Sequence, residues 1–203
     1  MTLSAATTTL RARTREAVKD QVVDAALELF IQHGYDAVTV EQIATSVGLS
    51  RRSLHRYFSS KDDIILCKYD TLGDTFVELL QARPLDEQGW ESLQHVFAAL
   101  SSSAGDDELA RRDQHMTTII NGSPSLFAGF LERSQRAQAQ LANALREREQ
   151  QRGEPADPND PRFEAVVAAA CACRTVALTM SASTGMDFQQ SLSVAMGALT
   201  PTA

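Results

Sequence analysis

Basic side chains gather in residues 42–61, a stretch that holds four Lys/Arg residues and no Asp or Glu. Arginine pairs bidentately with the O6 and N7 atoms of guanine, and both Arg and Lys neutralise phosphates. On a helical wheel that places Leu54 on the buried side, Arg52 and Arg56 fall on the opposite side. This stretch therefore predicts contact with the phosphates and base edges of nucleic acid.

Two short helices joined by a glycine turn must position these side chains. Thr39 and Gln42 form a capping box that opens the first helix. Gly48 permits the turn, and Ser50 can cap a second helix over about residues 51–58. This arrangement is a helix-turn-helix. We expect its small core to consist of Ile43, Val47, Leu49, Leu54 and Phe58.

The net charge of the whole chain obscures this basic segment. The 203 residues are 43% hydrophobic and carry a formal charge of −7, which by itself argues against a nucleic-acid partner. Residues 1–61, however, hold eight basic and six acidic residues, whereas residues 62–203 hold eleven and twenty. The positive charge is therefore concentrated at the N-terminal end of an acidic protein.

The rest of the chain has the periodicity of helices and lacks the alternation typical of strands. We therefore predict an all-α fold with an N-terminal three-helix DNA-binding part and a helical C-terminal part. The expected divisions are a basic flexible arm over residues 1–17, the helix-turn-helix domain over 18–62, and a second helical domain over 63–203. The basic residues of the arm could touch the DNA backbone or minor groove, or remain solvated.

Several other classes of function are disfavoured by the sequence. Three cysteines without a CxxC motif suit a reducing cytoplasm. The four histidines have no metal-binding spacing, and neither a nucleophile elbow nor a phosphate-binding loop is present, so we predict no metal, no cofactor and no enzyme. Residues 165–184 are apolar, but Arg174 would lie in mid-membrane, which favours a buried interface helix and no membrane partner.

The segment from about Val18 to Ile65 resembles the DNA-binding domain of TetR-family transcriptional regulators. The resemblance rests on AALELF, HGYDAVTVEQIA, VGLS and the aromatic pair Tyr57-Phe58 three residues before Lys61. It implies a homodimer that binds a near-palindromic double-stranded DNA operator, most often as a repressor. It also implies that residues 63–203 are an effector-binding and dimerisation domain, and that a small-molecule effector bound there releases the DNA. The family's contact positions, together with Arg56 of the outward face, give the candidate DNA-binding residues Thr39, Arg51, Arg52, Ser53, His55, Arg56, Tyr57 and Lys61.

One departure from the family pattern concerns the recognition helix. Many members have Thr or Ala followed by Gly-Thr-Phe-Tyr, whereas this chain has Arg51-Arg52-Ser53-Leu54-His55. The different outward face implies a different operator, and the additional arginines favour G-rich half-sites.

The resemblance also implies that the last two helices form an intersubunit four-helix bundle. Their apolar surface exceeds what one face of a monomer needs, and small residues allow helices to approach closely. The candidate dimer-interface residues are Val166, Val167, Ala170, Cys173, Val176, Ala177, Met180, Leu192 and Met196.

Charged residues that interrupt apolar stripes are candidates for an effector pocket, because buried charge is costly unless it is paired or used. The candidate ligand-pocket residues are Phe97, Arg112, Asp113, Met116, Phe127, Phe130 and Arg174. An Asp–Arg pair and ordinary core packing are the competing interpretations. The region also resembles a subgroup with an acyl-CoA-type ligand domain, which would make the effector apolar or acyl-CoA-like.

Two other functions remain as alternatives at this point. The chain could be a helical protein-interaction module without specific DNA binding, or a small helical enzyme. Labelled DNA from upstream of the protein's own gene separates the regulator from the interaction module. A screen for hydrolase and transferase turnover separates it from the enzyme.

Overall fold

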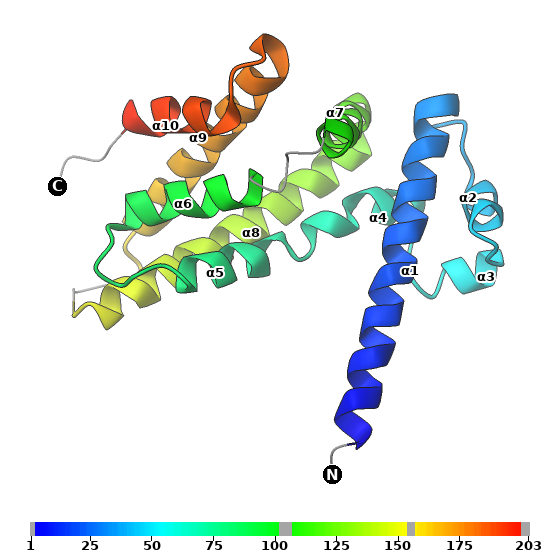
Figure 1. Ribbon diagram of the computed structural model, residues 1–203, viewed down its shortest axis with the longest axis horizontal. Coiled ribbons are helices and arrows are strands. Elements are labelled where there is room, and N and C mark those ends of the chain that lie inside the picture. The colour runs from blue at the N-terminus through cyan, green and yellow to red at the C-terminus, as the bar shows by residue number, and fades with distance from the viewer. Residues whose placement is uncertain (1–2, 102–106, 154–156, 200–203) are drawn as a thin grey trace. The chain divides into compact units, whose positions relative to one another are not determined.

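All the regular structure among the described residues of the computed structural model is helical, which confirms the predicted all-α class (Figure 1). The structure describes the backbone of residues 3–101, 107–153 and 157–199, and the side chains of residues 13–100, 115–153 and 157–199. In chain order the helices are α1 (Leu3–His33), α2 (Val40–Ser46), α3 (Arg51–Leu54), α4 (Lys61–Leu66), the 3-10 helix η1 (Cys67–Tyr69), α5 (Leu72–Gln81), α6 (Gly89–Ser101), α7 (Asp107–Gly122), α8 (Pro124–Gln151), α9 (Arg162–Thr184) and α10 (Phe188–Gly197).

The chain forms two compact units. The N-terminal unit contains Met1–Lys68 and His115–Gly129, and the C-terminal unit contains Tyr69–Gln114 and Phe130–Ala203. The sequence predicted a single domain boundary after residue 62. The structure instead returns the end of α7 and the start of α8 to the first unit, a long-range association that no local pattern encodes.

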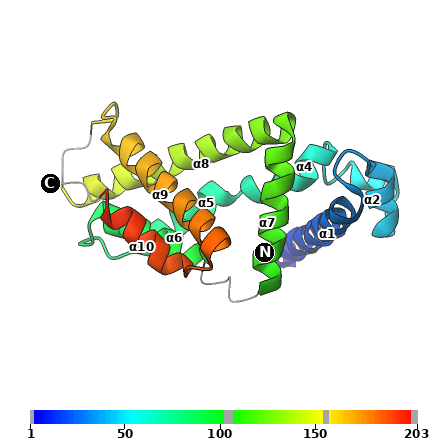
Figure 2. The same ribbon diagram turned by 90° about the horizontal axis from the view of Figure 1, so that it is seen from above.

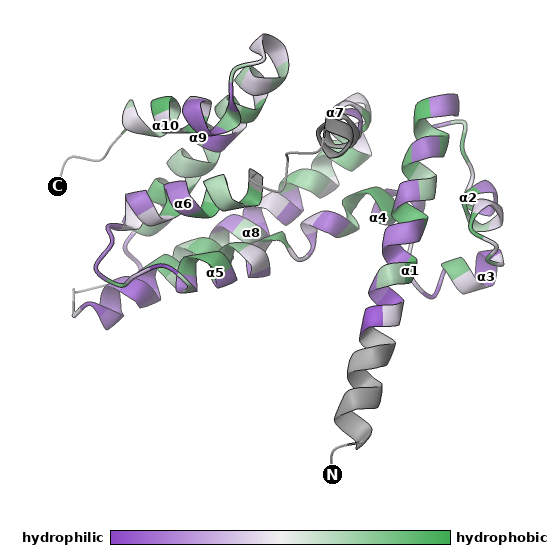
Figure 3. Cartoon of the chain, in the orientation of Figure 1, coloured by the Kyte–Doolittle hydropathy of each residue, from purple (hydrophilic) through white to green (hydrophobic). Residues whose placement is uncertain are grey.

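The first helix begins earlier than the sequence predicts. The described backbone is helical from Leu3, so residues 3–17 continue α1 where a flexible arm over residues 1–17 was expected. No glycine or proline precedes Gly34, and Ala, Leu, Arg and Glu are good helix formers. Gly34 ends the helix with a φ of +83°. Figure 3 shows hydrophilic and hydrophobic bands alternating along the described part of α1, whose apolar side packs beside α2 and α4.

The core of the C-terminal unit is formed by α5, α6, α8, α9 and α10. The rings of Phe76 and Phe97 meet edge to face with their centroids 5.4 Å apart. Trp90 Nε1 donates a 3.2 Å hydrogen bond to the carbonyl oxygen of Met196, which ties α6 to α10. Figure 2 shows α10 lying beside both α6 and α9.

Helix α9 presents one face to this core. Its buried residues are Phe163, Val167, Ala170, Cys173 and Ala177. Gly185 ends the helix with a φ of +72°, and the carboxylate of Asp187 accepts a 2.9 Å hydrogen bond from Gln190 N to cap α10. Among the described helices, α9 alone is long and apolar enough to cross a membrane by length and composition. The face of α9 that carries the buried residues packs against the core of the C-terminal unit.

The interface prediction for α9 and α10 therefore needs correction. Six of its nine residues are buried within their own chain and cannot also cover a partner; these are Val167, Ala170, Cys173, Ala177, Leu192 and Met196. Val166 is half-buried, whereas Val176 and Met180 are exposed. Both faces of α9 are rich in small apolar residues, so apolar content alone did not distinguish the inner face from the outer one.

Candidate nucleic-acid interface

Side-chain caps set the start of each short helix in the N-terminal unit. Thr39 Oγ1 accepts a 3.2 Å hydrogen bond from Gln42 N, and Gln42 Oε1 accepts a 2.8 Å bond from Thr39 N. This confirms the capping box that the sequence predicts at the start of α2. Ser50 Oγ caps α3 by accepting from Ser53 N at 3.1 Å, and Ser60 caps α4 in the same way.

The turn between α2 and α3 depends on glycine and closes over a small core. Gly48 has a φ of +69°, a region that favours glycine. Ile43, Leu54 and Phe58 are buried, as predicted. The other two expected core residues, Val47 and Leu49, are only half-buried. The regular α-helix of α3 is also shorter than expected, because it ends at Leu54 and continues as a turn.

The opposite side of α3 and its following turn is exposed and basic. Arg51, Arg52, His55 and Arg56 are all exposed, whereas Ser53 is half-buried beside the Ser50 cap. The helical wheel predicts that Arg52 and Arg56 point away from Leu54. The exposure of the two arginines and the burial of Leu54 are consistent with this prediction. This surface carries donors that fit phosphate oxygens and guanine edges.

An acidic residue lies next to this basic surface. Glu41 Oε1 in the first turn of α2 is 2.6 Å from Arg51 Nη1, and both side chains are more than half exposed. In the sequence, Glu41 lies one residue before the basic stretch of residues 42–61, and no local pattern connects it with Arg51. The separation of ten residues follows neither helical nor hairpin spacing, so only the folded turn reveals the pair.

Lys61, a predicted phosphate contact, also holds the chain together. Its Nζ donates to the carbonyl oxygens of Tyr35 at 2.7 Å and Val38 at 3.0 Å, and it lies 4.1 Å from the centroid of the Tyr35 ring. An ammonium group has three donors, so these bonds leave one for another acceptor. Lys61 thus fixes the loop before α2, and its contact with phosphate remains a prediction.

A hydrogen-bonded group centred on Asp62 joins three segments of the N-terminal unit. Tyr35 Oη donates to Asp62 Oδ1 at 2.5 Å, and Ser125 Oγ donates to Asp62 Oδ2 at 2.6 Å. Burial works to raise the pKa of Asp62, but the bonds from Ser125 and Tyr35 outweigh it and hold that pKa below its usual range. Burial, reinforced by Asp62, raises the pKa of Tyr35. The sequence offered no signal for a group assembled from such distant residues.

The candidate ligand residues are divided between the two units, and the surroundings of each lie within its own unit. Phe97 is fully buried against Phe76, and Phe130 meets Tyr69 edge to face at 5.0 Å. Met116 is buried and Phe127 is exposed in the N-terminal unit, and Arg174 is half-buried on α9. Arg112 and Asp113 lie outside the residues whose side chains are described. For Phe97, the structure agrees with the core-packing interpretation.

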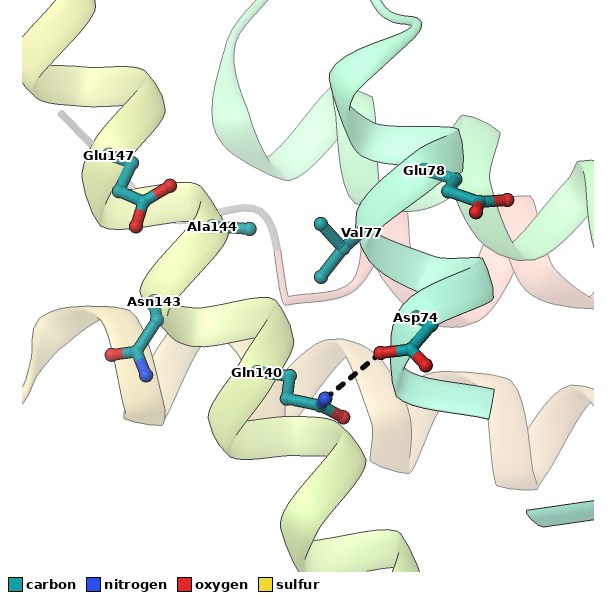
Figure 4. Close-up of a pocket in the computed structure, with 7 residues that line it drawn as sticks. All are labelled: Asp74, Val77, Glu78, Gln140, Asn143, Ala144 and Glu147. Carbon is teal, nitrogen blue, oxygen red and sulfur yellow. Dashed lines mark hydrogen bonds between the residues drawn. The ribbon is translucent and has the colours of Figure 1, made fainter. Parts of the chain in front are cut away.

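A surface groove in the C-terminal unit lies between α5 and α8 (Figure 4). Gln140 Nε2 donates a 3.1 Å hydrogen bond to Asp74 Oδ1 across it. The groove is lined by Asp74, Val77, Glu78, Gln140, Asn143, Ala144 and Glu147, none of which was a predicted ligand residue. Its three carboxylates repel anions, so this groove does not suit an acyl-CoA.

A second polar group lies at the start of α6. Glu87, Glu91 and His95 bring possible metal-ligand atoms within 4.8 Å of one another. However, Arg83 donates to both Glu87 carboxylate oxygens at 2.5 and 2.9 Å, and Ser92 and His95 also contact them at 2.7 and 2.9 Å. Because these contacts already occupy the carboxylate, we assign this group to structure and not to a metal.

Comparison with known proteins places the helix-turn-helix in a family. Residues 22–66 match the family model described as bacterial regulatory proteins, tetR family. The HTH-type transcriptional regulator TcmR of Streptomyces glaucescens is 33% identical over 144 residues, which cover 69% of this chain and 64% of TcmR. The chain thus spans less than two thirds of the length of this relative.

Solved structures extend the similarity in fold to most of the chain. SmeT, the repressor of the Stenotrophomonas maltophilia multidrug efflux pump SmeDEF, matches with a TM-score of 0.57 at 21% identity, covering 88% of this chain and 86% of SmeT. Thermus thermophilus FadR, a transcriptional repressor solved with lauroyl-CoA, matches with a TM-score of 0.52 at 19% identity, covering 89% and 92%. At these identities the matches establish the shared fold.

Proposed function

Because this chain belongs to the TetR family of bacterial regulatory proteins, we propose that it binds a specific DNA operator as a homodimer and regulates transcription. The matched relative is a transcriptional regulator and not an enzyme. In our proposal the protein acts in the cytoplasm as a repressor, and a small molecule releases it from DNA.

The observation that carries the DNA-binding proposal is the exposed basic surface of α3 and its following turn. Arg51, Arg52 and His55 project from a segment whose inner residues, Leu54 and Phe58, are buried. In a helix-turn-helix the second helix enters the major groove with its N-terminal residues nearest the bases. We therefore assign base reading to Arg51 and Arg52, with Ser53 and His55 beside them.

Phosphate contacts would flank this base-reading surface. Thr39 is exposed at the N-cap of α2, and Tyr57 and Lys61 are half-buried at the other end of the motif. Arg56 is exposed between Tyr57 and the base-reading residues. Contacts of this kind fix the register of a protein on the duplex without reading its sequence.

The outer face of α9 supports the homodimer proposal. Val176 and Met180 are 52% and 38% exposed, and Val194 on α10 is 66% exposed. The hydroxyl groups of Thr179 and Ser183 donate back to the carbonyls four residues earlier, at 3.0 and 2.8 Å. These polar groups are therefore satisfied within the helix and could be buried against a partner at little cost. We place the dimer interface on this outer face.

The effector proposal is supported by the molecules that two related folds were solved with. FadR was solved with lauroyl-CoA, and SmeT has been solved with triclosan, so related folds bind apolar or acyl-CoA-like molecules. If the effector is acyl-CoA-like, the side chains that bind its anionic groups would be those of Arg111, Arg112 and Arg174. A bound effector raises the melting temperature by mass action, so a thermal-shift screen that includes lauroyl-CoA and triclosan tests this proposal.

Binding to DNA from upstream of the protein's own gene tests the regulator proposal. We expect binding that is much tighter than to random DNA at the same salt concentration. Equal affinity for both DNAs would favour the alternative, a helical interaction module. Arg162 is an exposed arginine of the C-terminal unit. Arg162→Ala is therefore the control for Arg52→Ala, because each variant loses one positive charge.

A further inference from the structure

Arg15 of α1 contacts the end of the segment that presents the base-reading residues. Its Nη2 atom donates a 3.0 Å hydrogen bond to the carbonyl oxygen of Arg56. Its guanidinium carbon also lies 5.2 Å from the centroid of the Tyr57 ring, within the range of a cation–π interaction. One side chain therefore contacts two consecutive residues, 41 and 42 positions later in the sequence.

The segment that Arg15 contacts has little regular structure of its own. The α-helix of α3 spans only Arg51–Leu54, and the chain then turns, with Tyr57 N and Phe58 N both donating to the carbonyl of Leu54 at 2.9 and 3.1 Å. Helices this short are marginal without tertiary support. A contact from outside the turn therefore has a direct effect on how α3 is held.

Helix α1 is held in place by its own packing, so it can support such a contact. Val22, Ala26 and Phe30 are buried along one side of it, which anchors the helix in the N-terminal unit. Arg15 lies on the same continuous helix, about two turns before Val22. The guanidinium group has a rigid planar fork of donors, so it can bond a carbonyl with one nitrogen while it lies over a ring.

From these contacts we infer that Arg15 is a positioning residue for DNA recognition. It fixes the carbonyl of Arg56 and the ring of Tyr57, and through them the orientation of Arg51 and Arg52. It acts without contacting the DNA itself. This inference rests on the proposed function, although the contacts of Arg15 can be tested without DNA.

Amide exchange of the free protein is the first test. In Arg15→Ala we expect the Tyr57 and Phe58 amides to exchange several-fold faster, whereas the Ile43 amide of α2 stays unchanged. Arg13→Ala removes an exposed arginine of the same helix and should leave all three amides unchanged. Arg15→Lys should give an intermediate rate. Unchanged exchange at Tyr57 and Phe58 in Arg15→Ala would overturn the inference, whether or not the protein binds DNA.

The dependence of DNA binding on salt is the second test. A residue that contacts phosphate contributes to the slope of log K against log salt, whereas a positioning residue does not. We expect Arg15→Ala to lower operator affinity about three- to tenfold with an unchanged slope. The losses from Arg15→Ala and Tyr57→Leu should be less than additive in the double variant. A slope lower by about one would show a direct phosphate contact and contradict the inference.

If the unaltered protein shows no specific DNA binding, the proposed function fails, and the exchange experiment still decides whether Arg15 holds this turn. Circular dichroism of each variant shows whether the helical fold is retained. Arg15 is exposed, so we expect every variant at this position to fold.

Discussion

The hydroxyl group of Ser125, in the first turn of α8, donates a 2.6 Å hydrogen bond to the carboxylate of Asp62, in the first turn of α4. The two residues are 63 positions apart in the sequence. The bond links the segment that returns from the C-terminal unit to the helix directly after the helix-turn-helix. Asp62 also accepts from Tyr35, so three segments meet at one carboxylate.

The Asp62 group should contribute to the stability of the N-terminal unit. We expect Ser125→Ala and Asp62→Asn each to lower the free energy of unfolding by about 1 kcal/mol at neutral pH, because each removes a hydrogen bond to a charged acceptor. The pKa of Asp62 is lowered on folding, so its contribution is present above its unfolded pKa and is lost as the pH falls. Urea unfolding measures the effect, with Asp20→Asn, an exposed site on α1, as the control. Equal stability of Asp62→Asn and Asp20→Asn would contradict this role.

Glu87 should make the C-terminal unit sensitive to acid. The hydrogen bonds from Arg83 outweigh burial and, with Ser92, lower the pKa of Glu87 from 4.5 to about 2. A lowered pKa means that this stability is fully present above about pH 4.5 and is lost as the pH falls toward 2. We expect Glu87→Gln to cost up to about 3 kcal/mol at pH 7 and much less near pH 2.

Chemical unfolding as a function of pH measures this difference. Glu132→Gln is a suitable control, because the Glu132 side chain is 73% exposed and belongs to a surface ion pair. A Glu87→Gln penalty that stays constant from pH 7 to pH 2 would show that shape and not charge determines the contribution of this residue.

Removal of Glu41 should strengthen DNA binding. Its carboxylate lies 2.6 Å from Arg51 Nη1 on an exposed surface, where such pairs add little stability but place negative charge near phosphates. We expect Glu41→Gln to raise operator affinity about threefold and to leave the melting temperature nearly unchanged. Fluorescence anisotropy with labelled DNA measures the change. Weaker binding would instead mean that Glu41 holds Arg51 in its base-reading orientation.

Charge placed on the outer face of α9 should separate the subunits. We expect Val176→Asp and Met180→Asp to give monomers with reduced operator affinity, because a monomer engages only one half-site. Light scattering coupled to size-exclusion chromatography gives the mass. Leu85→Asp, at an apolar residue that is 49% exposed between α5 and α6, should leave the dimer intact. A dimer that persists in both α9 variants would place the interface elsewhere.

The parts of the fold that the sequence predicted well are those set by neighbouring residues. The Thr39–Gln42 capping box and the Gly48 turn each depend on residues within a few positions. Leu54 and Phe58 were predicted to be buried because their spacing follows the helix period.

The parts that were missed depend on contacts between distant segments. The bonds of Lys61 to the Tyr35 and Val38 carbonyls, and of Arg15 to Arg56, use backbone oxygens, which no sequence pattern identifies. Six of the nine residues in the interface prediction are buried within their own chain, and this was missed for a different reason. Ala170 and Ala177 face the core while Val176 faces outward, and their residue types alone do not distinguish the two faces.

The central claim is that the exposed surface of α3 reads a specific DNA sequence. Anisotropy of a labelled duplex from upstream of the protein's own gene, compared with a random duplex at the same salt, tests it most directly. We predict that the specific duplex binds at least about a thousandfold more tightly. Arg52→Ala should cost about 1–3 kcal/mol on that duplex and much less on random DNA. Equal affinity of the unaltered protein for both duplexes, or an equal loss on both in Arg52→Ala, would contradict the claim.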